Sequence, residues 1–149
     1  MKLKLAAVAL LPLATVLTLN SRVHAQPPTQ SVWDGVYTEV QAKRGEALFE
    51  QNCITRHGSA LEGDGEAPPL SGGEPFWAWN GKPMTALFDK IHKEMPHNRP
   101  GTLSAEASAE LLAYVLQFDM FPAGATELPH DPAALNQIRY ESKKPGSKK

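Results

Sequence analysis

The chain has a single cysteine, Cys53, which lies four residues before His57 in the segment Asn-Cys-Ile-Thr-Arg-His-Gly. A thiol and an imidazole at this spacing could hold a haem, with the thiol bonded to a porphyrin vinyl group and the imidazole reaching the iron from the same turn. The usual pattern for this chemistry is Cys-x-x-Cys-His, and here Arg56 stands in place of the second cysteine. Because nothing else in the chain offers comparable chemistry, the interpretation of this segment decides the function.

Other chemistries for this pair are less well supported. One cysteine cannot form an internal disulfide, and no Cys/His spacing in the chain is typical of a zinc site. A thiol nucleophile activated by His57 would need a third residue to orient the imidazole, and none is evident beside the glycine-rich stretch that follows. The residues therefore favour haem over zinc binding or thiol catalysis.

The stretch before Cys53 has the spacing of a helix. Residues 38–51 place apolar side chains among polar ones at helical intervals, and Thr38 with Gln41 three residues on forms a predicted capping box. Gly45 interrupts this helix, so we expect another backbone to approach closely there.

Two more helices are predicted further along the chain. In residues 83–95 the apolar residues recur every fourth position, Pro83 suits a first-turn position and Pro96 ends the pattern. Ser104 is the predicted N-cap of a third helix over 105–118. Between the first two helices, residues 57–82 are rich in glycine and proline and form a long loop. Three short helices bury too little apolar surface to fold comfortably, which indicates that a cofactor completes the core.

The two ends of the chain have a different character. Residues 1–25 have a basic start, an apolar run and a small-x-small end, so they predict a cleaved export signal, with an uncleaved membrane anchor as the alternative. Residues 26–33 are interpreted as a Pro-rich leader, and residues 131–149 as a basic, mobile C-terminal tail. Three of the 15 basic residues and none of the 16 acidic ones lie in 1–25, so the exported chain has a net charge of −4. That charge does not suggest a nucleic-acid partner.

Residues 34–130 resemble class I c-type cytochrome domains, in particular the small exported cytochromes that accompany quinoprotein dehydrogenases. The resemblance rests on the order of its parts: an opening helix that ends at Cys53, a Pro-rich loop, a methionine in the pattern Met-Pro-x-x-x-Pro-Gly at 95–101, and a closing helix. It implies an all-α, cytochrome c-like fold of three to four short helices wrapped around one haem, with long Pro/Gly loops. The attachment motif is degenerate, Cys-x-x-Arg-His.

The resemblance also implies roles for individual residues. His57 would be the proximal iron ligand and Met95 the distal one, with His97 as a rival, and either Pro68 or Pro69 would present a backbone carbonyl to the imidazole of His57. Met95 read without the resemblance is an ordinary core methionine. Trp77 and Trp79 are candidates to line the haem edge, and either could instead be simple packing residues. Gly45 and Phe49 are expected to meet Tyr114.

Arg56 leaves three arrangements open. The domain holds one haem c through a single thioether at Cys53, holds haem without a covalent bond, or is a degenerate haem-free interaction module. With haem, we expect a periplasmic electron carrier with no catalytic residues, which passes single electrons between a dehydrogenase and an acceptor. Its expected partners are a quinoprotein dehydrogenase or a terminal oxidase, and we expect neither nucleic-acid binding nor stable membrane insertion.

Overall fold

A computed structural model describes residues 30–72 and 78–146. The predicted export signal over 1–25, the first four residues of the leader and Trp77 lie outside these residues. None of the helices among the described residues is both long and apolar enough to cross a membrane.

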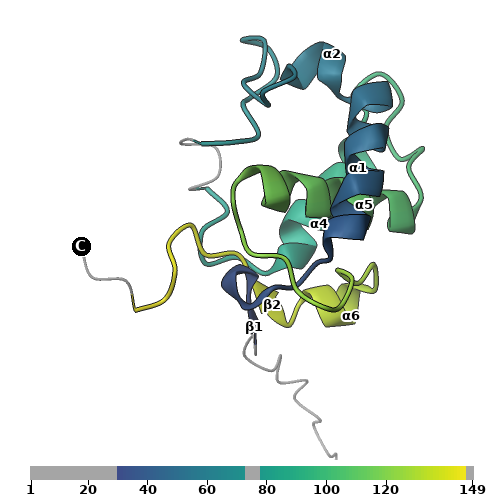
Figure 1. The fold of residues 1–149 in the computed structure, drawn as a ribbon. Coiled ribbons are helices and arrows are strands. Elements are labelled where there is room, and N and C mark those ends of the chain that lie inside the picture. The colour runs from purple at the N-terminus through teal and green to yellow at the C-terminus, as the bar shows by residue number, and fades with distance from the viewer. Residues whose placement is uncertain (1–29, 73–77, 147–149) are drawn as a thin grey trace, which may run out of the picture.

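The described residues form a small all-α fold, as the sequence predicts. Helix α2 lies at one end of the molecule and α6 at the other, with α1, α4 and α5 between them (Figure 1). The helices are α1 (Glu39–Asn52), α2 (Ile54–His57), α4 (Met84–Glu94), α5 (Ala105–Phe118) and α6 (Pro132–Leu135), with a 3-10 helix at Val32–Asp34 and two short strands, β1 (Gln30–Ser31) and β2 (Ile138–Arg139).

Helices α1 and α5 pack against each other at a point where α1 has no side chain. A Cβ atom added at Gly45 would lie 1.9 Å from the backbone oxygen of Glu110, so only glycine permits this approach. One turn later, the rings of Phe49 and Tyr114 pack with their centroids 5.3 Å apart. The predicted contact of Gly45 and Phe49 with Tyr114 is confirmed.

The N-terminal caps follow the predictions with one difference. The hydroxyl of Ser104 accepts a hydrogen bond from the N–H of Ala107, and that of Thr38 accepts one from the N–H of Gln41. The side chain of Gln41 does not complete the capping box. It is buried, donates to the carbonyl of Leu128 at 2.9 Å and accepts from the N–H of Leu128 at 2.7 Å. This pair of bonds joins the start of α1 to the chain after α5.

Helix α4 covers a second side of the core. Its residues Met84, Leu87 and Phe88 are buried, and it packs against α5. Pro83 lies just before the helix as its N-cap, rather than within the first turn. The helix ends at Glu94, so Met95 follows it directly.

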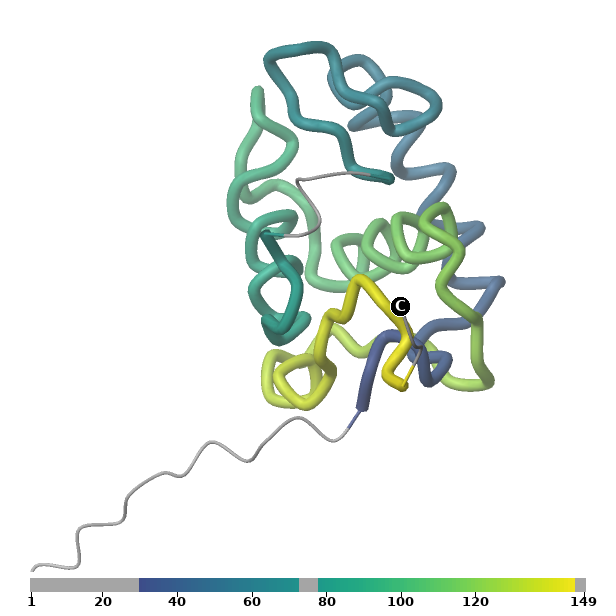
Figure 2. The backbone as a smooth tube through the Cα atoms, turned by 90° about the vertical axis from the view of Figure 1, so that its left-hand side faces the viewer, coloured from purple at the N-terminus to yellow at the C-terminus, as the bar shows by residue number. Residues whose placement is uncertain are grey.

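Residues 30–33 and 132–140 are ordered parts of the fold. The interpretation of 26–33 as a leader and of 131–149 as a mobile tail is therefore wrong for these residues. Strands β1 and β2 pair in parallel, with Gln30 opposite Ile138, and the segment that contains β2 runs beside the N-terminal end of the fold (Figure 2). Hydrogen bonds from Gly81 to Tyr140 and from Tyr140 to Lys82 join the same segment to the turn before α4. The buried apolar side chains of these ends are Val32, Leu135, Ile138 and Tyr140. Strands of two residues are too short to show alternation in a sequence, so periodicity could not reveal them.

Candidate functional site

Cys53 lies at the junction of two helices. It is the C-cap of α1, where its N–H donates to the carbonyl of Phe49 at 2.8 Å, and the N-cap of α2. Its own carbonyl accepts from the N–H of His57 at 3.0 Å. Helix α2 therefore holds the thiol and the imidazole one turn apart, which is the local arrangement that the attachment pattern requires.

The imidazole of His57 is buried and has a defined hydrogen-bond partner. Its Nδ1 lies 3.0 Å from the backbone oxygen of Pro68, and only 7% of the residue is exposed. A carbonyl oxygen can only accept, so Nδ1 carries the hydrogen and Nε2 of the neutral ring is left as the free donor atom for a metal. Of the two candidate prolines, the structure places the carbonyl of Pro68, not that of Pro69, against the imidazole.

Asp64 shapes the loop that delivers this carbonyl. Its Oδ1 accepts from the N–H of Glu66 at 3.0 Å and from the N–H of Ala67 at 2.6 Å, while the N–H of Gly63 donates to the carbonyl of His57 at 2.9 Å. The loop is thus folded back onto the end of α2 before it reaches Pro68. Asp64 was not among the residues predicted for the site, although an aspartate followed by Gly-Glu-Ala is a signal for such a side-chain-to-backbone turn.

The electrostatic setting favours a neutral imidazole and a protonated thiol. Burial lowers the pKa of His57, and the positive charge of Arg56 acts in the same direction, against the opposing effects of the Pro68 hydrogen bond and Asp64. A neutral imidazole is the form that binds a metal. Burial raises the pKa of the Cys53 thiol to about 11, so the thiolate that a nucleophile needs is scarce at neutral pH.

Arg56 has an acidic partner within the protein that was not predicted from the sequence. Its Nη2 lies 3.8 Å from Oε2 of Glu66, and its side chain is 36% exposed. Such an exposed pair contributes little stability. It does show that Arg56, which replaces the second cysteine within α2, has its side chain at the surface, next to the loop that contains Glu66.

Met95 is half-buried at the end of α4, and its N–H donates to the carbonyl of Ile91 at 3.1 Å. The loop that follows reaches the cysteine end of α1, because Nη2 of Arg99 lies 3.3 Å from Oδ1 of Asn52. The structure therefore brings the Met95 loop to the residue directly before Cys53. The rival ligand His97 is exposed.

Apolar side chains at the edge of the core are only partly covered. Trp79 is one of them, and the ammonium of Lys82 lies 4.9 Å from the centre of its ring. The others nearest the site in sequence are Cys53, Ile54, Leu70, Ile91 and Leu103. A porphyrin bound beside the core would need partly covered apolar side chains of this kind to pack against.

These residues fit a haem c, with a limit on the number of covalent bonds that the chain can form to it. The donor set is a neutral imidazole of defined tautomer and the thioether of Met95, and within the described ranges no cluster of three His, Cys, Asp or Glu could hold another metal ion. With Cys53 as the single cysteine, at most one thioether can form. The joint ligation of one iron by His57 and Met95 stays a prediction.

A comparison with known protein families agrees with this chemistry. The family model described as "Cytochrome C oxidase, cbb3-type, subunit III" matches residues 40–115, about half of the chain. The match runs from the start of α1 into α5 and includes Cys53, His57 and Met95. No curated protein and no solved structure matches the chain.

Proposed function

This chain belongs to the cbb3-type cytochrome c oxidase subunit III family of c-type cytochrome domains, and on that premise we propose that it is an exported carrier of single electrons. Haem-based electron transfer is the general function that membership indicates. The observation that carries the proposal is the hydrogen bond between His57 and Pro68, since it leaves the other ring nitrogen free to bind a metal.

Each residue of the site has a specific task in this proposal. Cys53 forms the single thioether, His57 is the proximal ligand, and Met95 is the distal ligand. A haem held by histidine and methionine supplies one-electron chemistry with both axial positions filled, which favours electron transfer over reaction with oxygen. Pro68 orients the proximal imidazole, and Trp79 lines the edge of the haem. In this proposal the protein makes and breaks no substrate bonds, so it has no catalytic residues.

The proposed partners are redox proteins in the periplasm. The family name points to a terminal oxidase of the cbb3 type as the acceptor, either as a separate protein or as the complex in which this chain is a subunit. A dehydrogenase, such as a quinoprotein dehydrogenase, is the proposed donor. Periplasmic location rests on the predicted signal over 1–25.

The proposal is tested with the full chain expressed in a host that matures c-type cytochromes in its periplasm. We expect a Soret absorption band from the native protein and a haem-stained band after denaturing electrophoresis. The Cys53→Ala variant should lose the stain, because its haem would be extractable. A protein with neither Soret band nor stain would refute the proposal, whereas a Soret band without stain would show haem held by its axial ligands alone.

Arg56 motivates a second candidate, a haem-free module that docks to a larger oxidoreductase. The Arg56–Glu66 contact supports it, since the arginine that replaces the second cysteine has an acidic partner within the protein itself. The Arg56→Cys variant separates the two candidates. If haem is incorporated only by that variant, the natural chain is the module, and if both proteins incorporate haem, the carrier is favoured.

A further inference from the structure

The loop after Met95 is joined to the end of α1 by an exposed arginine. Residues 97–102 of this loop are all exposed. Within the described part of the chain, one side-chain hydrogen bond connects them to another element, from Nη2 of Arg99 to Oδ1 of Asn52 at 3.3 Å. Asn52 is the last residue of α1 and directly precedes Cys53. The bond therefore links the loop that begins after Met95 to the helix that ends at the cysteine.

Both partners of this bond are held in place by their own neighbours. Nδ2 of Asn52 donates to the carbonyl of Leu48 at 2.9 Å, so the amide is turned with its oxygen free to accept from Arg99. The N–H of Arg99 donates to the carbonyl of Pro96 at 2.8 Å, and its carbonyl accepts from the hydroxyl of Thr102 at 2.8 Å. These local bonds lower the entropy that is lost when the two side chains meet.

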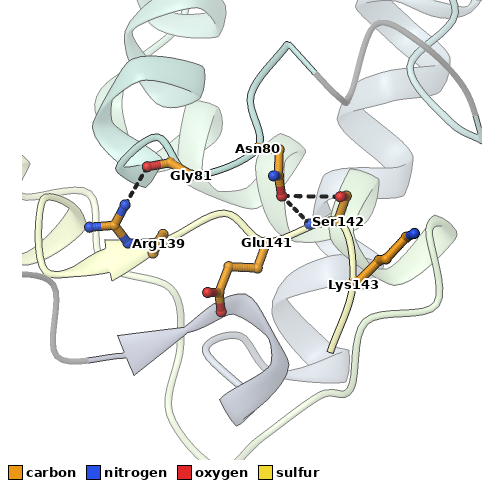
Figure 3. A pocket seen from close by; sticks show the side chains of 6 residues that line it. All are labelled: Asn80, Gly81, Arg139, Glu141, Ser142 and Lys143. Carbon is orange, nitrogen blue, oxygen red and sulfur yellow. Dashed lines mark hydrogen bonds between the residues drawn. The ribbon is translucent and has the colours of Figure 1, made fainter. Parts of the chain in front are cut away.

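Helix α4, which directly precedes Met95, is anchored at its start by the C-terminal segment. Nη1 of Arg139 donates to the carbonyl of Gly81 at 2.6 Å, and Oδ1 of Asn80 accepts from the N–H of Ser142 at 2.9 Å and from its hydroxyl at 3.0 Å (Figure 3). The buried residues of α4 all lie in its first half. The position of Met95 therefore depends on what holds the end of the helix and the loop beyond it.

The last turn of α4 is held to α5 by a histidine. Nδ1 of His92 lies 3.2 Å from Oγ of Ser108. The hydroxyl of Ser108 donates to the carbonyl of Ser104 at 2.9 Å, so its oxygen accepts and Nδ1 of His92 is the donor. Met95 comes three residues after His92 and four before Arg99. It thus lies between a bond that fixes the end of the helix and a bond that fixes the loop.

We propose, on the basis of the proposed function in which Met95 is the distal ligand, that Arg99 is a positioning residue for Met95. Through its bond to Asn52, Arg99 holds the loop against α1 and keeps the thioether of Met95 on the haem iron. It supplies no ligand itself, because a guanidinium has no acceptor atom. Since Cys53 allows at most one covalent bond to the haem, the axial ligands matter more for holding the haem than they would with two such bonds.

Imidazole titration of the oxidised, haem-loaded protein tests the proposal, because added imidazole must displace Met95 to reach the iron. Its apparent affinity rises with the fraction of the protein in which Met95 is off the iron. Arg99→Met keeps the bulk of the side chain without a donor, so we expect imidazole to bind about threefold to tenfold more tightly. Asn52→Leu should have a similar effect. The double variant should change the affinity little further, since each substitution removes the same bond.

Three further variants separate positioning of Met95 from a general effect on the fold. Lys93→Met removes the same charge from the exposed face of α4 and should leave the imidazole affinity unchanged. Arg99→Lys keeps a positively charged donor and should recover part of the natural behaviour. In the Met95→Ala background, Arg99→Met should have no effect, because no methionine is left to displace. An equal gain in affinity with and without Met95 would overturn the proposal, as would equal gains in Arg99→Met and Lys93→Met.

Failure of this inference can be told apart from failure of the proposed function. If Met95→Ala binds imidazole more tightly than the natural protein does and Arg99→Met does not, Met95 is the distal ligand and the role of Arg99 is refuted. If Met95→Ala and the natural protein bind imidazole alike, or if the chain incorporates no haem, the proposed site is refuted and the role of Arg99 with it. Circular dichroism of each haem-loaded variant shows whether the fold is retained.

Discussion

Arg56 changes the attachment segment at one position, and its effect is local. It removes the second covalent bond that the usual pattern would provide, but it does not disturb the helix that holds Cys53 and His57. Its charge, next to the imidazole, adds to burial in lowering the pKa of His57. Compared with the usual Cys-x-x-Cys-His pattern, Arg56 thus leaves at most one cysteine for a thioether, while its charge favours the neutral form of the imidazole, which is the form that binds a metal.

Met95 can be tested as the distal ligand with the Met95→Ala variant of the haem-loaded protein. We expect the haem to stay attached while the iron gains an open position that binds added imidazole or cyanide. Visible absorption spectra with and without the added ligand measure this. The His97→Ala variant is the matched control and should behave as the natural protein. A Met95→Ala spectrum identical to that of the natural protein would show that Met95 is not a ligand.

Asp119 makes the stability of the folded protein depend on pH. Burial raises the pKa of its carboxyl from the ordinary value of 3.8 to about 6, although a hydrogen bond from the N–H of Gly72 opposes the shift. The folded state therefore binds this proton more tightly than the unfolded state does. Its contribution to stability is complete below the unfolded pKa, near 3.8, and is lost as the pH rises through about 6.

The Asp119→Asn variant should remove this part of the pH dependence while it keeps an acceptor for Gly72. Urea denaturation at a series of pH values between about 4 and 7 measures the free energy of unfolding. In the natural chain this one group makes the free energy fall across that range, and the variant should lack that component. Glu106→Gln, in the exposed first turn of α5, serves as the control. If the free energy of unfolding changed with pH by the same slope in both variants, the assignment of this pH dependence to Asp119 would be contradicted.

At the scale of elements, the contact of α1 with α5 connects the fold to the site. Helix α1 ends at Cys53, so its packing determines where the thiol and α2 lie. Gly45 permits the close approach, and the buried amide of Gln41 ties the other end of α1 to Leu128. The start and the middle of the helix are therefore positioned by residues far away in the sequence.

Gly45→Ala tests this packing, because two effects predict changes of opposite sign in the free energy of unfolding. Helix propensity alone would stabilise the variant by up to about 1 kcal/mol. The added methyl group would lie 1.9 Å from the carbonyl oxygen of Glu110, so we expect destabilisation of roughly 1–3 kcal/mol instead. Urea denaturation distinguishes the two. A stabilised variant would show that α1 and α5 do not approach as closely as the structure places them.

At the scale of the whole molecule, the chain ends complete the core. Residues 132–140 pair through β2 with strand β1, and they are hydrogen-bonded to the turn that leads into α4. The ends therefore support the helix that directly precedes Met95, although they lie outside the region that matches the family.

Two truncations test this arrangement. Removal of 131–149 would delete the buried side chains of Leu135, Ile138 and Tyr140, at a cost of roughly 5 kcal/mol from lost apolar burial. That cost is comparable with the entire stability of a small domain, so we expect the protein that lacks 131–149 to be unfolded. Removal of 145–149 alone should change little, because Pro145 and Gly146 are exposed. Far-ultraviolet circular dichroism and urea denaturation measure both, and equal stability of the two truncated proteins would contradict the prediction.

The sequence by itself determined the features that depend on neighbours along the chain. The three long helices, their caps at Thr38 and Ser104 and the end of the second helix before Pro96 follow from local spacing and from backbone hydrogen bonds within one turn. The relation of Cys53 to His57 is also local, because four residues of helix hold both. The family, and with it the kind of cofactor, was therefore predictable from residue order.

Only the tertiary structure decided the contacts between distant residues. It selected Pro68 over Pro69, gave Gln41 a partner in Leu128 rather than in its own helix, and placed the two ends in the core. Sequence periodicity does not distinguish between two adjacent prolines. It also reveals neither the partner of a buried glutamine nor a strand of only two residues. Their energies come from burial and hydrogen bonds across the fold, which exist only once the chain is folded.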